Sequence, residues 1–122
     1  MKINYANEYI KARNMYYLIG FLMCPSLGNK LVYFNSDGFR HFTKKGKTRR
    51  TEFEQIRRFK LIPYMRRVIT SNETVVEEHR VILKTEYISL IYMVDSKYYI
   101  KIVVRKVLDG RISFVSIMDM QK

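Results

Sequence analysis

The sequence has 122 residues, close to the usual size of one domain, and 48 % of them are hydrophobic, including ten Tyr and seven Phe. This is enough apolar side chain to form a core without disulfides or metals, and it excludes a disordered chain. Lys and Arg number 23 against 11 acids, a net charge of +12. Such a charge repels itself unless a polyanion neutralises it. Nucleic acid, an anionic membrane or an acidic protein would serve, and a basic domain favours nucleic acid, above all RNA.

Cysteine and histidine are scarce in this chain. Cys24 is the single cysteine, so no internal disulfide and no cysteine-based metal site can form. With His41 and His79 as the only histidines, we expect no metal and no cofactor. A chain without disulfides indicates a cytoplasmic protein. The apolar run 15–23 is half the length of a membrane span, so we interpret it as core and expect no membrane partner.

The first half of the chain predicts helices, a strand and a basic loop. Apolar residues at three- and four-residue steps predict a helix over 5–23, closed by Pro25 and Gly28. A short strand follows at 31–34, and Asn35-Ser36-Asp37-Gly38 is typical of a turn.

The segment 39–50 is polar and basic, and Gly46 predicts the tip of a hairpin with arms 39–43 and 47–50. Thr51 followed by Glu54 is a capping-box pattern that predicts the start of a helix. The buried stripe expected for this helix consists of Phe53, Ile56 and Phe59. Pro63 ends or kinks it, and a short helical segment over 64–70 follows.

The second half changes to a strand pattern. Four β-type runs cover 75–84, 86–94, 97–107 and 111–118, with short breaks such as Asp109-Gly110. Short breaks force antiparallel neighbours, so we expect a four-stranded antiparallel meander. The fold class is then α+β, with N-terminal helices packed on the sheet. We expect one domain over 1–122, with a helical and basic-loop part over 1–72 and the sheet over 73–122.

Most of the positive charge lies in one stretch. Between residues 40 and 67 there are eleven Lys/Arg against two Glu, a local excess of +9. Such a cluster predicts a phosphate-binding surface, although a basic loop beside a soluble helix, without any ligand, would give the same pattern. The nucleic-acid contacts expected from this stretch are Arg40, Lys44, Lys45, Lys47, Arg49, Arg50, Arg57 and Lys60.

The run 97–107 adds cations from the sheet. Alternation places Tyr99, Lys101 and Arg105 on one face and Ile100 and Ile102 on the other, which must cover the helices. Two cations and an aromatic ring suit RNA phosphates and a stacked base, and Tyr99 is the expected stacking residue. Lys and Arg also decorate the solvent face of many antiparallel sheets.

In the last run, alternation predicts that Ser116 shares the apolar face with Ile112, Phe114 and Met118. A Ser in such a row either hydrogen-bonds a neighbour or sits at the edge of a site.

The order of these features resembles a family of ribonucleases. The segment Asp37-Gly38-Phe39-Arg40-His41, the basic loop, the run Gln55-Ile56-Arg57-Arg58-Phe59-Lys60-Leu61-Ile62-Pro63 and the sheet resemble small phage and mobile-element nucleases of the barnase–EndoU–colicin–RelE group, over roughly residues 31–118. The resemblance implies a metal-independent endoribonuclease of toxin type. Such enzymes activate the ribose 2′-hydroxyl against the adjacent phosphate.

The resemblance also implies roles for particular residues. His41 is the candidate acid or base, and Arg58 and Arg105 would hold the phosphate. Lys101 would assist, and Ser116 would orient a ligand atom. Each has an alternative: His41 as an exposed loop residue, for example, or Arg58 as the partner of Glu54 on its own helix.

Two functions follow from this sequence. The first is a ribonuclease toxin, neutralised by an acidic immunity or antitoxin protein. The second is a non-catalytic RNA- or DNA-binding module, or a phage inhibitor of a host nucleoprotein. The nuclease hypothesis requires that His41, Arg58 and Arg105 converge on one phosphate-sized hollow.

Overall fold

The computed structural model describes residues 4–107 and 110–121, which form an α+β fold. The helices are α1 (Tyr5–Ile19), α2 (Ser36–Thr43), α3 (Glu52–Phe59) and α4 (Met65–Thr70), with short 3-10 helices η1 (Pro25–Leu27) and η2 (Ile62–Tyr64). The strands are β1 (Phe21–Cys24), β2 (Lys30–Tyr33), β3 (Lys44–Lys45), β4 (Thr48–Arg49), β5 (Val75–Ile82), β6 (Thr85–Met93), β7 (Tyr98–Val107) and β8 (Ile112–Gln121).

The main sheet has six strands in the order β1-β2-β8-β7-β6-β5. The expected α+β class is confirmed, whereas the expected four-stranded meander is not, because the sheet has six strands. Within this sheet β5 to β8 are neighbours, each antiparallel to the next. The expected sheet lacked β1 and β2, and β2 runs parallel to β8. Asp109 of the predicted Asp-Gly turn lies outside the described residues.

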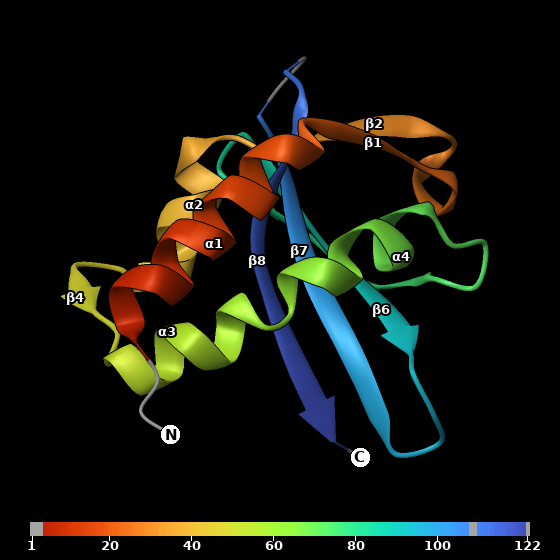
Figure 1. The fold of residues 1–122 in the computed structure, drawn as a ribbon. Helices are drawn as coiled ribbons and strands as arrows, with labels where there is room; N and C mark the ends of the chain where they lie inside the picture. The colour runs from red at the N-terminus through yellow and green to blue at the C-terminus, as the bar shows by residue number, and fades with distance from the viewer. Residues whose placement is uncertain (1–3, 108–109, 122) are drawn as a thin grey trace.

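The helices lie against one face of this sheet. Figure 1 shows α1 crossing in front of the upper part of β8 and β7, with α2 beside α1 and α3 to the left of β8, and the green segment that leads from α3 to α4 crosses in front of the same strands. The apolar face expected for β7 is confirmed, because Ile100, Ile102 and Val104 are fully buried. We call the other side, which carries Tyr99, Lys101 and Arg105 of β7, the second face.

The first helix is shorter than its sequence pattern suggested. It ends at Ile19, because Gly20 adopts a positive φ of 70° that breaks the helical path. The next four residues form β1, in which Leu22 and Cys24 are buried and their neighbours are exposed. The apolar run 15–23 is therefore part helix and part strand, and the predicted helix over 5–23 was wrong in its last turn.

The segment after β2 is a helix, where the sequence suggested a turn and one arm of a hairpin. Asn35 caps α2, since its side-chain oxygen accepts a hydrogen bond from the Gly38 amide at 3.1 Å. The helix buries Phe39 and Phe42 in the core. Helical packing of these two rings outweighed the local turn signal. The hairpin tip at Gly46 was predicted correctly, but its arms are only β3 and β4.

The helix α3 begins as predicted, with the Thr51 hydroxyl accepting from the Glu54 amide at 3.2 Å. Its buried stripe was wrong at Phe53, which is 80 % exposed. Gln55 is buried instead: its amide nitrogen donates to the Arg50 carbonyl at 2.8 Å, and its oxygen accepts from the Tyr5 hydroxyl. Two satisfied hydrogen bonds make burial of this polar side chain possible. Pro63 lies in η2, and α4 follows as expected.

A β-bulge changes the alternation of β8. Val103 pairs with Ser116 while Val104 pairs with Phe114, so one residue of β8 is extra between these pairs. Beyond the bulge, Ile117 is buried and lies on the core face, where Ser116 and Met118 had been expected. The prediction that Ser116 and Met118 share the apolar face with Phe114 was therefore wrong, because strict alternation does not pass through a bulge.

Replacing Gly38 with Ala is expected to destabilise the protein by about 1–3 kcal/mol, since overpacking at a close approach forces neighbours to move. A Cβ atom at this position would lie 2.5 Å from the Tyr16 hydroxyl and 2.7 Å from the Phe114 carbonyl oxygen. Urea unfolding measures the change. The matched control is Ser36→Ala in the same turn, where the side chain is exposed. Equal stabilities for the two variants would show that α2 does not approach β8 this closely.

Candidate functional site

A hollow of about 310 Å³ lies between α2, the β3–β4 hairpin and β7. We call it the α2–β7 hollow, and its lining residues are Asp37, Arg40, His41, Lys44, Gly46 and Arg105. Three cations face one carboxylate here, so the hollow carries a net charge of about +2 with the imidazole neutral. Of the residues expected to converge, His41 and Arg105 do meet in this hollow.

Helix spacing explains how α2 supplies most of the lining. Asp37, Arg40, His41 and Lys44 recur at three- and four-residue steps, so they share one side of the helix and its C-cap. The opposite side carries Phe39 and Phe42, which are buried. The amphipathic character of α2 therefore both anchors the helix and orients its charges.

Hydrogen bonds connect the start of α2 to β8 and to α1. The Tyr16 hydroxyl donates to the Asn35 carbonyl at 2.7 Å, and the Asn35 amide donates to the Ser113 hydroxyl at 3.4 Å. Burial raises the pKa of the Tyr16 phenol, so it stays a proton donor. Ser113 pairs with Arg105 across the sheet, which brings Arg105 next to the first turn of α2.

Asp37 lies between two guanidinium groups. Its carboxylate is 3.5 Å from Arg105 and 3.4 Å from Arg40. All three side chains remain at least partly exposed, so these ion pairs add little stability. Their effect is to orient the two guanidinium groups over the same hollow. Asp37 was expected only as a turn residue, and nothing in its local sequence marked this role.

The environment of His41 favours its neutral form. Burial, together with the charges of Arg105 and Arg50, lowers the pKa of His41 below its ordinary value of 6.5, and Asp37 opposes this only in part. The imidazole is therefore a free proton acceptor at neutral pH. The alternative interpretation of His41 as an exposed loop residue was wrong, because it is half-buried on a helix.

Arg50 makes its contacts within the protein, although it was expected to contact nucleic acid. Its side chain is only 8 % exposed and lies 3.2 Å from the Glu54 carboxylate. Its Nε donates to the His41 carbonyl at 3.0 Å. Arg50 thus links α3 to the end of α2 and contributes positive potential to His41. Arg50 is also the actual partner of Glu54, for which Arg58 had been considered.

Arg58 does not line the α2–β7 hollow. It donates to the Ile117 carbonyl of β8 at 3.0 Å, and burial lowers its pKa. With Arg57, which is 3.2 Å from Asp119, it lines a separate hollow of about 190 Å³ beside Met118 and Met120. The expected convergence of Arg58 with Arg105 is therefore wrong, because the Arg58 side chain binds a β8 carbonyl beyond the two positions at which β2 pairs with that strand.

The second face of the sheet carries the other expected residues. Lys101 lies 3.2 Å from Glu77, and Tyr99 is half-buried two residues away. The bulge places Ser116 opposite Val103, between Lys101 and Arg105 along β7. Lys101 and Arg105 are four residues apart, about 13 Å along the strand. Neither Lys101 nor Ser116 lines the hollow.

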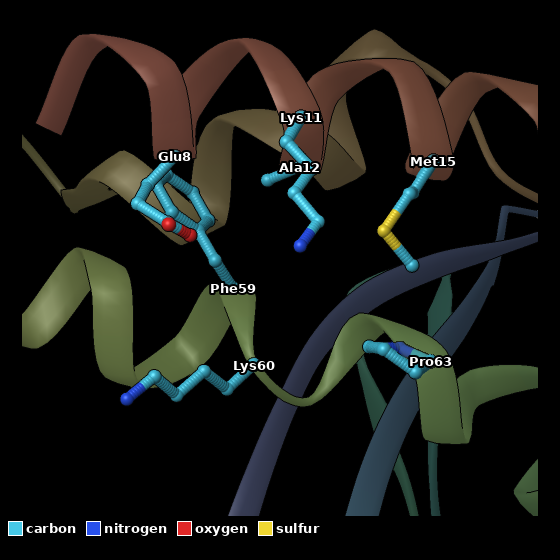
Figure 2. Close-up of a pocket in the computed structure, with 7 residues that line it drawn as sticks. All are labelled: Glu8, Lys11, Ala12, Met15, Phe59, Lys60 and Pro63. Carbon is cyan, nitrogen blue, oxygen red and sulfur yellow. The ribbon is translucent and has the colours of Figure 1, made fainter. Parts of the chain in front are cut away.

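The remaining basic residues are spread over two surfaces. Lys45, Lys47 and Arg49 are exposed on or beside the β3–β4 hairpin, and the Arg49 guanidinium lies 5.6 Å from the centre of the Tyr5 ring. Lys60 lies at a different, largely apolar pocket of about 180 Å³ between α1 and α3. Figure 2 shows Lys11 and Met15 extending into it from α1. This pocket holds no arrangement that suggests chemistry.

Comparison with known proteins found no matching family model, no matching curated protein and no matching solved structure. Within residues 4–107 and 110–121, no helix is long and apolar enough to cross a membrane. The same residues contain no group of three or more His, Cys, Asp or Glu side chains that could hold a metal ion.

The site geometry predicts how His41 titrates. In Arg105→Gln the pKa of His41 is expected to rise, because a repelling cation is lost and Asp37 is freed to attract the proton. An NMR pH titration of the imidazole measures it, with Arg66→Gln on α4 as the matched control.

An unchanged His41 titration in Arg105→Gln would show that Arg105 does not act on the imidazole.

The lowered pKa of His41 also makes the stability of the protein depend on pH. Because the pKa is lower in the folded state than in the unfolded state, the stability that His41 contributes is complete above pH 6.5 and declines as the pH falls towards the folded-state pKa.

Proposed function

We propose that this protein binds RNA at the α2–β7 hollow and cleaves it as a metal-independent endoribonuclease. The observation that supports this is a half-buried imidazole with a lowered pKa that shares one hollow with Arg40, Lys44 and Arg105. A neutral base beside several cations suits phosphodiester chemistry, in which a proton is removed while negative charge develops on phosphate oxygens.

Phosphate binding rests on the two guanidinium groups. Arg40 and Arg105 are both held by Asp37, so their forks are already oriented before a ligand arrives. A bidentate fork fits phosphate oxygens, and preorganised cations lose little on binding. In this proposal Lys44 adds a third cation at the rim, and the exposed β3–β4 hairpin contacts neighbouring phosphates.

The proposed reaction assigns each proton and bond. The His41 imidazole accepts the proton of the ribose 2′-hydroxyl, and the 2′-oxygen attacks the adjacent phosphorus. The bond from phosphorus to the 5′-oxygen breaks, and this oxygen takes a proton from the Lys44 ammonium group. The products are a 2′,3′-cyclic phosphate and a 5′-hydroxyl end. Arg40 and Arg105 stabilise the charge on the non-bridging oxygens.

The sheet extends the proposed binding surface. A strand of RNA leaving the hollow along β7 would pass Ser116, Lys101 and Tyr99 on the second face. Lys101 would then exchange Glu77 for a phosphate, and Tyr99 would stack on a base. The resemblance to the barnase–EndoU–colicin–RelE nucleases implied the same class of reaction, with Arg58 as a phosphate ligand. The position of Arg58 removes it from this proposal.

A toxin of this type would require an inhibitor in the cell that makes it. An acidic immunity or antitoxin protein would cover the hollow by pairing carboxylates with Arg40, Lys44 and Arg105.

One observation favours a second function, a non-catalytic RNA- or DNA-binding module or an inhibitor of a host nucleoprotein. Asp37 already forms ion pairs with the guanidinium groups of both Arg40 and Arg105. His41 is the single imidazole among the residues that line the hollow. An anion-binding surface needs only the cations, whereas cleavage needs both a base and an acid.

The cleavage proposal predicts that purified protein degrades RNA in the presence of EDTA and leaves 2′,3′-cyclic phosphate ends. His41→Ala is expected to reduce the rate by about 10²- to 10⁴-fold, the usual contribution of a general base. The matched control is His79→Ala on the exposed strand β5, which should cleave at the wild-type rate. Circular dichroism checks that each variant is folded.

RNA that stays intact with wild-type protein, while binding is retained, would reject cleavage and leave the binding module. A His41→Ala variant that cleaves at the wild-type rate would reject the assigned base.

The binding proposal predicts a salt-dependent affinity for a single-stranded RNA. For a single strand, the slope of log K against log salt should fall by about 0.7 for each phosphate contact removed. We expect Arg40→Ala with Lys44→Ala to flatten the slope by about 1.4, measured by fluorescence anisotropy. The matched pair Arg66→Ala with Arg67→Ala removes two exposed cations from α4. Equal slopes for both pairs would show that the hollow is not the phosphate site.

A further inference from the structure

The two edges of the main sheet differ in length and cover. At one edge β1 has four residues and packs against α4. At the other edge β5 has eight residues, all of them exposed. In the described part of the chain, no strand pairs with the outer side of β5. β5 therefore presents a row of free backbone donors and acceptors, a ready template for another strand.

The side chains of β5 give this edge little protection. Val75, Val76, Val81 and Ile82 are each large, apolar and exposed, with Val81 reaching 63 %. Lysine and proline are two residues that often protect an edge strand, and β5 contains neither. A bulge between Val76 and Glu78 is its one irregularity. The apolar ends of β5 are thus suited to contact with a partner strand.

The residue order of β5 is self-complementary. It reads Val-Val-Glu-Glu-His-Arg-Val-Ile, with two apolar residues at each end, acids in the first half and bases in the second. Two copies that pair antiparallel about a two-fold axis bring the first half of one strand against the second half of the other. Apolar residues then face apolar residues, and acid faces base.

The bulge decides the register of such a pair. Glu77 has no partner on β6 and its carboxylate lies 3.2 Å from Lys101, so it is the extra residue. The other seven residues then pair about His79: Glu78 faces Arg80, Val76 faces Val81 and Val75 faces Ile82. Within one chain Glu78 and Arg80 already form an ion pair at 2.8 Å. Two such pairs, related by the two-fold axis, make a square of four alternating charges.

The local charge permits this contact in a strongly basic protein. The segment 73–86 has four acids against two Lys/Arg, while the whole chain carries +12. Two copies that approach through β5 keep their α2–β7 hollows apart, since the hollow is lined from β7 and β6 lies between β7 and β5 in the strand order. β5 is therefore an edge through which two copies can meet without strong repulsion.

We propose that two copies of this chain form a homodimer by antiparallel pairing of β5 with β5, which joins the two six-stranded sheets into one of twelve strands. The two-fold axis of such a pair is perpendicular to the sheet. Both helix layers then lie on one side, and both second faces lie on the other. The two α2–β7 hollows would therefore open on the same side of the joined sheet.

Charge reversal tests the pairing. Glu78→Arg places only bases in the central square, and Arg80→Glu places only acids there. Each variant alone is expected to dimerise at least about tenfold more weakly than the wild type, because like charges directly opposite each other are destabilising. The swap variant with both substitutions restores the alternation and should dimerise again, as should an equimolar mixture of the two single variants. Sedimentation equilibrium measures the dissociation constants.

Two controls separate this pairing from other causes. If net charge alone governed association, Arg80→Glu would strengthen the dimer by lowering the total charge, whereas the pairing predicts weakening. Glu52→Arg, on the exposed side of α3, changes the same charge away from β5 and should leave the dimer unchanged.

His79→Cys gives a second, geometric readout. Residues that face each other at a two-fold axis between antiparallel strands lie about 4.5–5.5 Å apart at Cα, within the range of a disulfide. Mild oxidation should cross-link this variant rapidly, and Lys84→Cys in the β5–β6 turn should not cross-link. A wild-type protein that sediments as a monomer at every concentration would overturn the proposal, as would a dimer indifferent to both charge reversals.

Discussion

The close approach of α2 to β8 is the constraint on which the rest of the structure depends. The parallel strand β2 pairs with β8 at only two positions, so most of that edge of β8 is left for helices. Gly38 lets the α2 backbone come close to Phe114, and the Tyr16 hydroxyl holds the Asn35 carbonyl at the start of the helix. A larger residue at position 38 would push the helix and its four polar side chains away from β7.

This docking also explains the electrostatics of the hollow. Arg105 comes from the middle of the sheet and Arg40 from the helix, yet both reach the same carboxylate on Asp37. Because His41 is half-buried, the imidazole loses solvation as it gains two cationic neighbours, Arg105 and Arg50. Desolvation and repulsion act in the same direction on its pKa. The same geometry that gathers positive charge for a polyanion therefore keeps the base in its neutral form.

The proposed nucleic-acid surface and the proposed dimer edge occupy different parts of the fold. The hollow is lined by residues of α2, of the basic β3–β4 hairpin and of β7, whereas β5 is the outermost strand on the far side of β6. Lys101 connects the two regions, since it lies on β7 and its partner is the bulged Glu77 of β5. A phosphate that displaced Glu77 from Lys101 would alter the charge next to the edge strand, so the two proposals meet at this ion pair.

The sequence by itself determined the α+β class, the cap of α3 at Thr51 and the concentration of positive charge between residues 40 and 67. These follow from local periodicity, capping chemistry and composition, which neighbouring residues decide. Tertiary structure alone decided that residues 36–43 form a helix, that Ser116 leaves the core face and that Arg58 binds a strand carbonyl instead of joining Arg105. Each of these depends on contacts between segments far apart in the chain, where packing of Phe39 and Phe42, a bulge in β8 and an unpaired strand edge outweighed the local pattern.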